Sequence, residues 1–430
     1  MAPLIPSIQT CLDQPQATTV VIIGAGIIGL TAALVLAERG IPVVVLEKGR
    51  IAGEQSSRNQ GWIRKMNRSA PDVPLAQASD RLWADLPARV GAEVGYCPCG
   101  ILYVASSDSE MATYQGWLDS VGDLELDSRL VTATHIQNLV PGGTGTWAGG
   151  LYTPSDGRAE PTLAASAIAR AAMAKGAVIV EHCAVRTLSL SAGKVSGVVT
   201  ERGEIRCEQV LLAGGVWSRR FLGNQSIDLP TLPLVASILR TAPLQGPGEI
   251  TVGAPDCSFR KRRDGGYTIS HRGVLAAPLT LDSLLLGLRY LPVLRGQWKN
   301  IRLSVGRELL GDLALGRRWQ AKQLSPFERV RTLDPPADPQ VNAEALRNLA
   351  AAWPVFKGAV VKQAWSGMLD VTPDSLPVIG PVAEVPGLTL ATGFSGHGFG
   401  TAPAAGQLAA DLVCASEPIV DPAPYRLDRF

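Results

Sequence analysis

The chain has 430 residues, more than a single hydrophobic core usually organises, so we expect two domains. Its 40 Lys and Arg residues are balanced by 38 Asp and Glu residues, which leaves a formal net charge of +2. So small a charge creates no field that would attract nucleic acid or an anionic membrane. We therefore expect a small-molecule partner and no nucleic acid.

The cysteines and the first residues favour a cytoplasmic protein with reduced thiols. Seven cysteines are scattered along the chain, unlike the dense and even spacing of a secreted disulfide scaffold. Cys97-Pro-Cys99 lacks the spacing of a zinc or thioredoxin motif, so we expect structural thiols and no metal site. Residues 1–18 have three prolines and no continuous apolar stretch, which is typical of a loose leader rather than a signal peptide.

The apolar pattern near the N-terminus predicts a βαβ unit. Thr19–Ile23 and Pro42–Leu46 are short apolar runs, and Leu30–Arg39 between them is rich in strong helix formers. Residues 20–37 form an uncharged run about as long as a membrane span. Three glycines interrupt that run, so we expect no transmembrane segment.

The turn of this unit has the spacing of a dinucleotide-binding loop. Gly24 permits the turn, Gly26 lets a pyrophosphate approach the backbone, and Gly29 lets the helix pack closely on the strand. The amides at the start of the helix then bind the phosphates. Glu47 follows the second strand at nearly the spacing needed to bind ribose hydroxyls. These residues predict a dinucleotide site, for either NAD or FAD.

Two further segments are candidates for the same site. Residues 55–64 are polar and contain glycine, which suits a loop beneath a long cofactor and equally suits a surface loop. Near the other end of the chain, Leu388–Leu390 predicts a strand and Ala402–Leu412 a helix, with a glycine turn at Gly393–Gly400 between them. The first amides of that helix would face an electron-rich group such as a flavin carbonyl. His397 in the turn fits this site or a capped loop equally well.

Later strands and Ala-rich helices alternate with regions of hairpins, which predicts a discontinuous domain organisation. We expect an α/β fold: a Rossmann-type FAD-binding domain and a substrate domain of α+β type with a mixed β-sheet. Residues 19–90, 151–228 and 340–430 are assigned to the FAD-binding domain, and residues 91–150 and 229–339 to the substrate domain. Leu275–Leu294 is too interrupted to span a bilayer, and we expect a core helix or an interface there.

Several motifs together resemble the FAD-dependent oxidoreductases that include D-amino-acid oxidase, glycine oxidase and sarcosine oxidase. The resemblance covers most of the chain. Besides the glycine turn with Glu47, it is carried by the following segments: Ser56–Asn59, Pro154–Gly157 with Pro161, Ala213–Trp217, Thr372–Gly380 and Gly393–Gly400. It implies FAD and oxidation of a C–N bond by hydride transfer to flavin N5, with no protein base required if the amine arrives deprotonated.

The resemblance leaves the electron acceptor and the assembly open. The acceptor is oxygen or another protein or quinone, and basic residues such as Lys65 and Arg260–Arg263 would favour oxygen only if they lay at the flavin rather than on the surface. One alternative is a flavin-bearing electron-transfer subunit of a hetero-oligomeric amine or opine dehydrogenase. Another is a nicotinamide dehydrogenase, which would carry no flavin.

Three positions bear on which substrate is bound and on how the flavin is held. Leu369 stands where glycine oxidase and D-amino-acid dehydrogenases have a carboxylate-binding arginine, and the segment around it looks like the sarcosine oxidase β subunit. This favours a secondary amine. Arg64 matches a carboxylate-binding arginine of monomeric sarcosine oxidase, although an arginine there also suits the surface or a phosphate. Gly367 matches the cysteine that attaches flavin in that enzyme, so we expect non-covalent FAD.

The resemblance also implies a full set of site residues. Catalytic or substrate-binding roles are expected for four side chains: Trp62, Arg64, Tyr267 and His397. Cofactor contacts are expected from the following residues: Gly24, Gly26, Ile28, Gly29, Glu47, Lys48, Ser56, Ser57, Arg58, Asn59, Gln60, Gly61, Val185, Gly214, Trp217, Gly367, Gly393, Ser395, Gly396, His397, Gly398 and Phe399.

Overall fold

The computed structural model describes residues 2–291, 301–304 and 307–430. The first layer of the fold is a sheet of six strands. The strand order is β20-β21-β12-β1-β2-β8. The bounds in that order are Val378–Pro381, Leu388–Thr392, Gln209–Leu212, Val20–Ile23, Val43–Leu46 and Val178–Val180. Five strands run parallel, and β20 runs antiparallel to β21.

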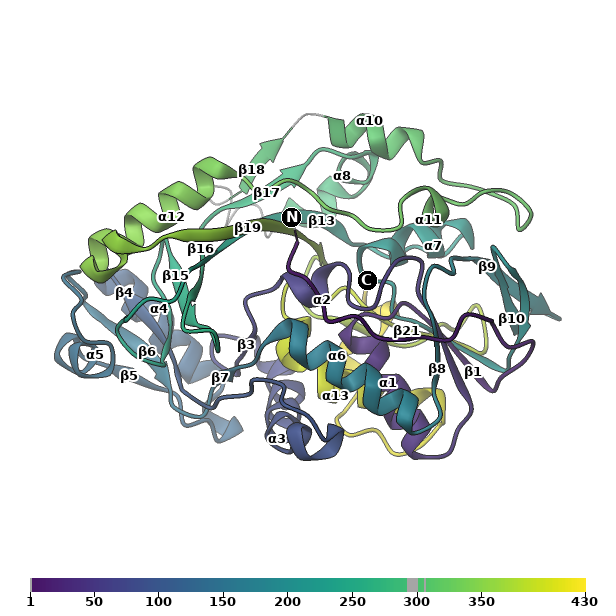
Figure 1. Cartoon of the computed structure of the whole chain (residues 1–430), viewed down its shortest axis with the longest axis horizontal. Helices are drawn as coiled ribbons and strands as arrows, with labels where there is room; N and C mark the ends of the chain where they lie inside the picture. The colour runs from purple at the N-terminus through teal and green to yellow at the C-terminus, as the bar shows by residue number, and fades with distance from the viewer. Residues whose placement is uncertain (1, 292–300, 305–306) are drawn as a thin grey trace.

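The central strands of this sheet are apolar on both faces because both faces are covered. Alternate residues of β1 belong to two different core clusters. Helices lie together on one face (Figure 1), and their bounds are α1 Ile27–Glu38, α3 Val73–Val90, α6 Pro161–Ala174 and α13 Gly398–Val413. An antiparallel sheet packs on the other face, with β9 Val185–Ser191, β10 Lys194–Thr200 and β11 Gly203–Arg206.

The predicted βαβ unit is confirmed, since β1, α1 and β2 occupy the expected segments and β1 pairs with β2 in parallel. Gly40 has a φ of +71° directly after the helix, a conformation that favours glycine. The expected strand before Gly393 is also present as β21, and α6 begins at Pro161. The local pattern therefore predicted this layer well.

The second layer is a mixed sheet of ten strands. Nine of them follow the order β18-β17-β13-β16-β15-β14-β4-β6-β5, and β19 pairs with β13. The bounds are β4 Ile101–Ala105, β5 Arg129–Val131, β6 Gly149–Thr153, β13 Leu232–Thr241, β14 Thr251–Gly253, β15 Ser258–Lys261, β16 Tyr267–Ser270, β17 Leu275–Pro278, β18 Ile301–Ser304 and β19 Val361–Val371. Helix α12 (Pro339–Ala352) covers it in the upper left of Figure 1.

The sheets divide the chain differently from the expected boundaries. Strand β19 pairs with β13 from Leu232 opposite Val371 to Thr241 opposite Val361, and α12 packs on the same sheet. Strand β19 lies within residues 340–430, and α12 begins directly before them at Pro339. The sequence assigns residues 340–430 to the FAD-binding domain. Strand β6 likewise crosses the expected boundary after residue 150. Pairing between strands so distant in sequence leaves no local signal, and the expected domains stay a prediction.

The apolar segment that begins at Leu275 is not one core helix. Strand β17 ends at Pro278, and Thr280 then caps the short helix α8 (Leu281–Leu286) by accepting a hydrogen bond from the Ser283 amide at 3.3 Å. A 3-10 turn follows, and residues 292–294 of the segment lie outside the described residues. Several leucines of this region are exposed, among them Leu284 and Leu288. Within the described ranges, no helix is long and apolar enough to cross a membrane.

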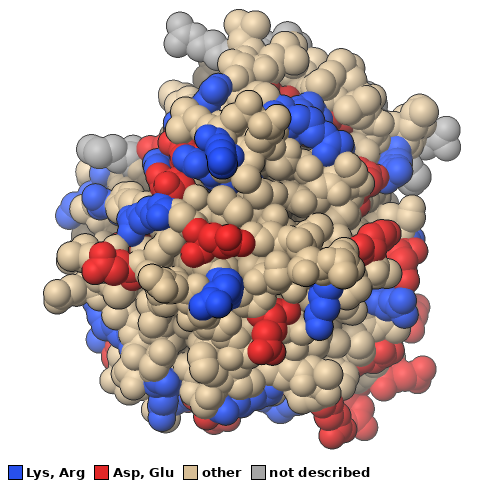
Figure 2. Space-filling model, turned by 90° about the vertical axis from the view of Figure 1, so that its right-hand side faces the viewer, with Lys and Arg blue, Asp and Glu red and all other residues tan. Residues whose placement is uncertain are grey.

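The remaining helices and short strands connect these layers. Their bounds are α2 Gln55–Arg58, β3 Trp62–Ile63, α4 Asp108–Ser120, α5 Ala133–Leu139, β7 Gly157–Arg158, α7 Ser218–Asn224, α10 Arg307–Ala314 and α11 Pro326–Arg329. Short 3-10 turns occur at η1 Ala70–Asp72, η2 Gly122–Leu124, η3 Gly215–Trp217, η4 Gly287–Tyr290, η6 Pro354–Gly358, η7 Ala423–Tyr425 and η8 Leu427–Arg429. Figure 2 shows basic and acidic side chains interspersed on one face of the molecule.

Candidate active site

The turn between β1 and α1 leaves no room for a side chain at two of its glycines and only a tight fit at the third. Gly24 has a φ of +106°, and a Cβ there would lie 2.5 Å from the carbonyl oxygen of Ala213. A Cβ on Gly29 would lie 2.2 Å from the carbonyl oxygen of Gly24. A Cβ on Gly26 would lie 3.2 Å from its nearest neighbour, the hydroxyl oxygen of Ser56. The backbone is therefore open to a ligand at Gly26, as the glycine spacing predicts.

The first amides of α1 include donors that the protein does not use. Ile27 donates its amide to the Ser56 hydroxyl at 2.9 Å. The amides of Gly26 and Ile28 have no acceptor among the described residues. Unused amides at a helix N-terminus, together with the helix dipole, form an anion-binding site. This arrangement fits the pyrophosphate of a dinucleotide.

Glu47 ends β2 and holds the glycine turn from its far side. Its carboxylate accepts the amide of Ala25 at 2.9 Å and the amide of Gly49 at 2.7 Å. Burial raises the pKa of this carboxyl, and the nearby Lys48 opposes that effect. The side chain also lines the cavity described next, where the sequence predicted a ribose contact.

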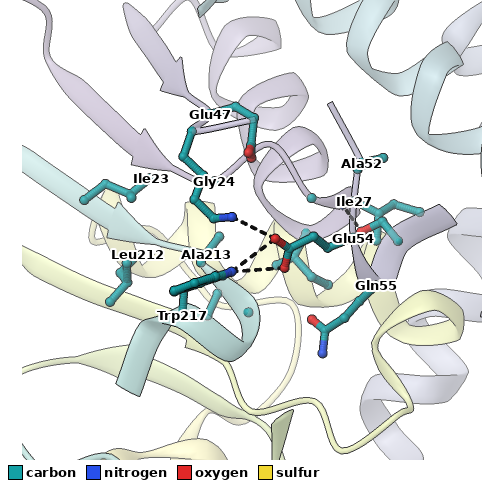
Figure 3. A pocket seen from close by; sticks show the side chains of 18 of the residues that line it. Ile23, Gly24, Ile27, Glu47, Ala52, Glu54, Gln55, Leu212, Ala213 and Trp217 are labelled. Carbon is teal, nitrogen blue, oxygen red and sulfur yellow. Dashed lines mark hydrogen bonds and ion pairs between the residues drawn. The ribbon is translucent and has the colours of Figure 1, made fainter. Parts of the chain in front are cut away.

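A cavity with an empty volume of about 900 Å³ opens at the carboxyl ends of β1, β2 and β12. This volume includes space that is open to solvent, and most of the lining is apolar, as is typical of cofactor sites. Figure 3 shows part of this lining. The predicted cofactor-binding residues that line it are Gly24, Gly26, Ile28, Glu47, Lys48, Ser56, Val185, Gly214 and Trp217. The cavity, the unused amides and the buried carboxylate together fit FAD.

Glu54 is the main cavity residue that the sequence did not predict. Its carboxylate accepts hydrogen bonds from Lys48 Nζ at 2.7 Å and from Trp217 Nε1 at 3.1 Å, and dashed lines in Figure 3 mark the contact with Trp217. Lys48 Nζ also lies 4.4 Å from the centre of the Trp217 ring. This network joins residues 48–54 to Trp217 across the cavity, and no spacing in the sequence relates these two segments.

The predicted loop after Glu54 is a partly buried segment rather than a free surface loop. Arg58 is buried and donates to Asp334 at 2.7 Å and to the carbonyl of Ser366 at 3.1 Å. Asn59 Oδ1 accepts the amide of Gly61 at 2.8 Å. Ser57 and Gln60 are likewise bonded to protein groups, at Glu54, Ser258 and Ser270. Of the loop beyond Gln55, only Ser56 lines the cavity.

The predicted C-terminal glycine turn lies beside this loop. The buried carboxylate of Asp370 accepts Gln55 Nε2 at 2.8 Å and the amide of Gly393 at 2.7 Å. Phe394 lines the cavity. The other predicted residues of the turn and of β19 are not in the cavity lining, and they are Gly367, Gly393, Ser395, Gly396, His397, Gly398 and Phe399. Their proposed contacts to cofactor stay predictions.

Arg64 and His397 are brought together although they are far apart in the sequence. Arg64 Nη2 lies 3.0 Å from His397 Nε2, and its Nη1 donates to the carbonyls of Met66 at 2.5 Å and Asn67 at 3.3 Å. Burial lowers the pKa of His397 well below 6.5, and the cation of Arg64 adds to this effect. Because a guanidinium only donates, His397 is a neutral acceptor at Nε2.

Tyr103 on β4 organises the side chains near Arg64, and no sequence signal identified it. The Arg64 guanidinium carbon lies 6.0 Å from the centre of the Tyr103 ring, and that of Arg272 lies 3.5 Å from it. The Trp62 ring is 5.9 Å from the same ring, centre to centre. The buried Nε1 of Trp62 has no hydrogen-bond partner among the described residues. Three of the four predicted catalytic residues therefore lie in one region.

Tyr267 does not join this region, which corrects its predicted catalytic role. Its side chain is fully buried in the core of the larger sheet, with its ring 5.9 Å from Phe259 and 5.0 Å from Phe356. Burial raises its pKa to about 12, and its hydroxyl lies 3.5 Å from the Gly248 carbonyl. The residues on either side of Tyr267 do not predict which face of the sheet its side chain occupies.

The cations considered for oxygen activation are also engaged within the protein. Lys65 Nζ pairs with Asp80 at 2.5 Å. The buried Arg260 pairs with Glu160 at 2.8 Å, and this partner holds the pKa of Glu160 at about 2 against the effect of burial. Neither cation lines the cavity.

The chain matches the family model described as DAO, FAD dependent oxidoreductase, over residues 19–412. It is 28% identical to glycine oxidase of Pseudomonas aeruginosa, over 94% of this chain and 97% of that protein. It is 24% identical to mitochondrial sarcosine dehydrogenase of Mus musculus over 97% of this chain, but spans only 42% of that protein.

Among solved structures, the L-amino acid deaminase from Proteus myxofaciens, in complex with anthranilate, has a TM-score of 0.95 and 32% identity to this chain. That match covers 99% of this chain and 96% of the other. The predicted family, α/β fold and FAD dependence are confirmed, and the nicotinamide alternative is excluded. The chain belongs to the DAO family of FAD-dependent oxidoreductases.

Proposed function

We propose that this oxidoreductase oxidises the C–N bond of an amino acid or secondary amine whose carboxylate is bound by Arg64. The observation that carries the proposal is the half-buried guanidinium of Arg64, which has five N–H donors, makes three hydrogen bonds and has no carboxylate partner among the described residues. A planar guanidinium with free donors is suited to bind a carboxylate bidentately.

The named relatives support a carboxylate-bearing substrate. Glycine oxidase, sarcosine dehydrogenase and L-amino acid deaminase act, by name, on amino acids, and the anthranilate bound to the deaminase is itself a carboxylate. These proteins differ in whether the amine is primary or secondary. We therefore keep sarcosine-like, D-amino-acid-like and cyclic imino-acid substrates in the proposal.

The chain's own residues orient the substrate and shape its electrostatic surroundings. The residues that line the cavity would hold FAD, which would supply the hydride acceptor for oxidation of the substrate carbon. Arg64 fixes the acid end of the substrate, and His397 in turn holds one N–H of Arg64 at 3.0 Å. Because His397 is neutral, it orients the guanidinium without adding a charge that would compete for the carboxylate. Holding the substrate in one orientation is a large part of catalysis by such an enzyme.

The proposal is tested by comparing amino acids with their decarboxylated amines. We expect sarcosine, proline or α-amino acids of either hand to reduce the flavin of the purified chain under anaerobic conditions, and their decarboxylated amines to do so far more slowly. The absence of any reduction by carboxylated amines, in protein whose flavin dithionite still reduces, would contradict the proposed function.

The same purified chain distinguishes an enzyme from an electron-transfer subunit. Turnover with an artificial acceptor, in the absence of other proteins, is the outcome we expect for an enzyme. A chain that takes up electrons only from a partner protein would instead fit the alternative, a subunit of a hetero-oligomeric dehydrogenase. Oxygen uptake, measured in parallel with the artificial acceptor, shows whether oxygen is the direct acceptor.

A cytoplasmic location stays a prediction.

We expect acid precipitation to release the flavin into the supernatant. No cysteine is among the residues that line the cavity, and Gly367 occupies the position where a cysteine would form the covalent link in the sarcosine oxidase comparison. The absorbance of pellet and supernatant measures the outcome. Flavin retained in the denatured pellet would show a covalent attachment through another residue.

A further inference from the structure

The cations near Arg64 fall into two groups that differ in their partners. Lys65 pairs with Asp80 at 2.5 Å, and Arg68 pairs with Asp72 at 2.6 Å. These two side chains are buried, as are most of their partners. They follow the general rule that a charge removed from water has a counter-charge within the protein. Their charges are therefore already compensated.

Arg64 and Arg272 do not follow that rule. Both are half-buried, and neither guanidinium lies within ion-pair distance of a carboxylate among the described side chains. Burial lowers the pKa of Arg64, Tyr103 opposes that effect, and the charges of Arg68 and Arg272 add to it. Both Arg64 and Arg272 lie near the ring of Tyr103. Two like charges held together away from water are unfavourable unless an anion joins them.

The two guanidiniums lie at different distances from the centre of the Tyr103 ring. The Arg272 carbon is 3.5 Å from the ring centre, within stacking distance, and this arginine opposes the rise in pKa that burial causes at the Tyr114 hydroxyl. The Arg64 carbon is 6.0 Å from the same centre. Tyr103 is buried on β4, so both guanidiniums lie near one ring of the core. Each guanidinium then presents its own set of donors.

We propose that Arg64 and Arg272 form a two-anion site, so that the substrate of this enzyme carries a second acidic group besides the carboxylate of the amino acid. This inference rests on the proposed function for the amine, whereas the two-anion site is testable without any oxidation. The substrate class is a dicarboxylic amino acid or imino acid. The second arginine selects it, because two cations are compensated by two anions.

Binding of acids that lack an amine tests the site directly. We would titrate the FAD-loaded protein with malonate, succinate and glutarate, and with butyrate as the monocarboxylate, by isothermal titration calorimetry. We expect one of the dicarboxylates to bind about ten-fold to a hundred-fold more tightly than butyrate, the effect of one added charge-assisted contact. Arg272→Gln should remove that difference, and Arg272→Lys should restore part of it.

Arg129→Gln is the matched control. Arg129 also lies over a tyrosine ring, 5.3 Å from the centre of Tyr152, but away from Arg64. The control should keep the preference for the dicarboxylate. Thermal melting and flavin content are measured for each variant, so that a loss of folding is distinguished from a loss of anion binding. Equal binding of dicarboxylate and butyrate by the unaltered protein, as expected if both arginines grip one carboxylate, would overturn the inference.

Substrate oxidation then separates this inference from the proposed function. Aspartate and asparagine, and glutamate and glutamine, are nearly isosteric pairs that differ in the second charge. We expect the acid of a pair to reduce the flavin faster than the amide, and Arg272→Gln to abolish the difference. Equal rates for acid and amide would overturn the inference and leave the proposed function standing. A protein that binds succinate preferentially and oxidises no amine would contradict only the proposed function.

Discussion

Replacing Gly26 with valine is expected to yield a folded protein without FAD. The space at Gly26 is bounded by Ser56 Oγ at 3.2 Å and opens into the cavity. Valine would fill the position where the pyrophosphate approaches the unused amides of α1. The effect on cofactor content should be close to complete. Flavin absorbance per protein and the melting temperature measure the two parts of this prediction.

The control for Gly26→Val is Gly116→Val. Gly116 lies in α4, and a Cβ there would have no atom within 4 Å. This variant carries the same side-chain change at a position that does not line the cavity, so it should bind FAD fully. Full flavin occupancy in Gly26→Val would contradict the placement of the pyrophosphate. Unfolding of that variant would be judged from its far-ultraviolet circular dichroism against the control.

Replacing Arg64 with alanine is expected to weaken the use of carboxylate-bearing substrates by a large factor. Truncating one partner of a desolvated charge pair costs about 2 to 5 kcal/mol. This corresponds to roughly thirty-fold to several-thousand-fold in kcat/KM. A neutral amine should lose little, because it makes no contact that needs the guanidinium. The measurement is kcat/KM for an amino acid and for a neutral amine in both proteins, at equal flavin content.

Arg64→Lys distinguishes charge from geometry at the same position. Lysine restores the positive charge without the planar fork, so we expect a partial recovery. An equal loss for acidic and neutral substrates would indicate that Arg64 supports the flavin or the fold instead. Unchanged kinetics in Arg64→Ala would move the carboxylate site to another residue, and Arg272 beside Tyr103 would be the first to examine.

Local sequence determined the dinucleotide half of the site. The glycine spacing requires Gly24 and Gly29 for reasons of backbone geometry, because a Cβ at either position would strike a backbone oxygen within 2.5 Å. Apolar runs predicted β1, α1 and β2 because strands buried on both faces have no polar alternation. Each of these signals lies within about thirty residues, so it does not depend on the rest of the fold.

Only the tertiary structure decided which side chains meet across the two sheets. Glu54 meets Trp217, and Arg64 meets His397, over separations of 163 and 333 residues. The sequence comparison assigned a catalytic role to Tyr267 and gave no signal for Tyr103. The pairing of β15 with β16 buries Tyr267 against Phe259, whereas β4 places Tyr103 beside two arginines. Strand pairing depends on how whole sheets pack, so the cofactor loop is encoded locally and the proposed substrate site is not.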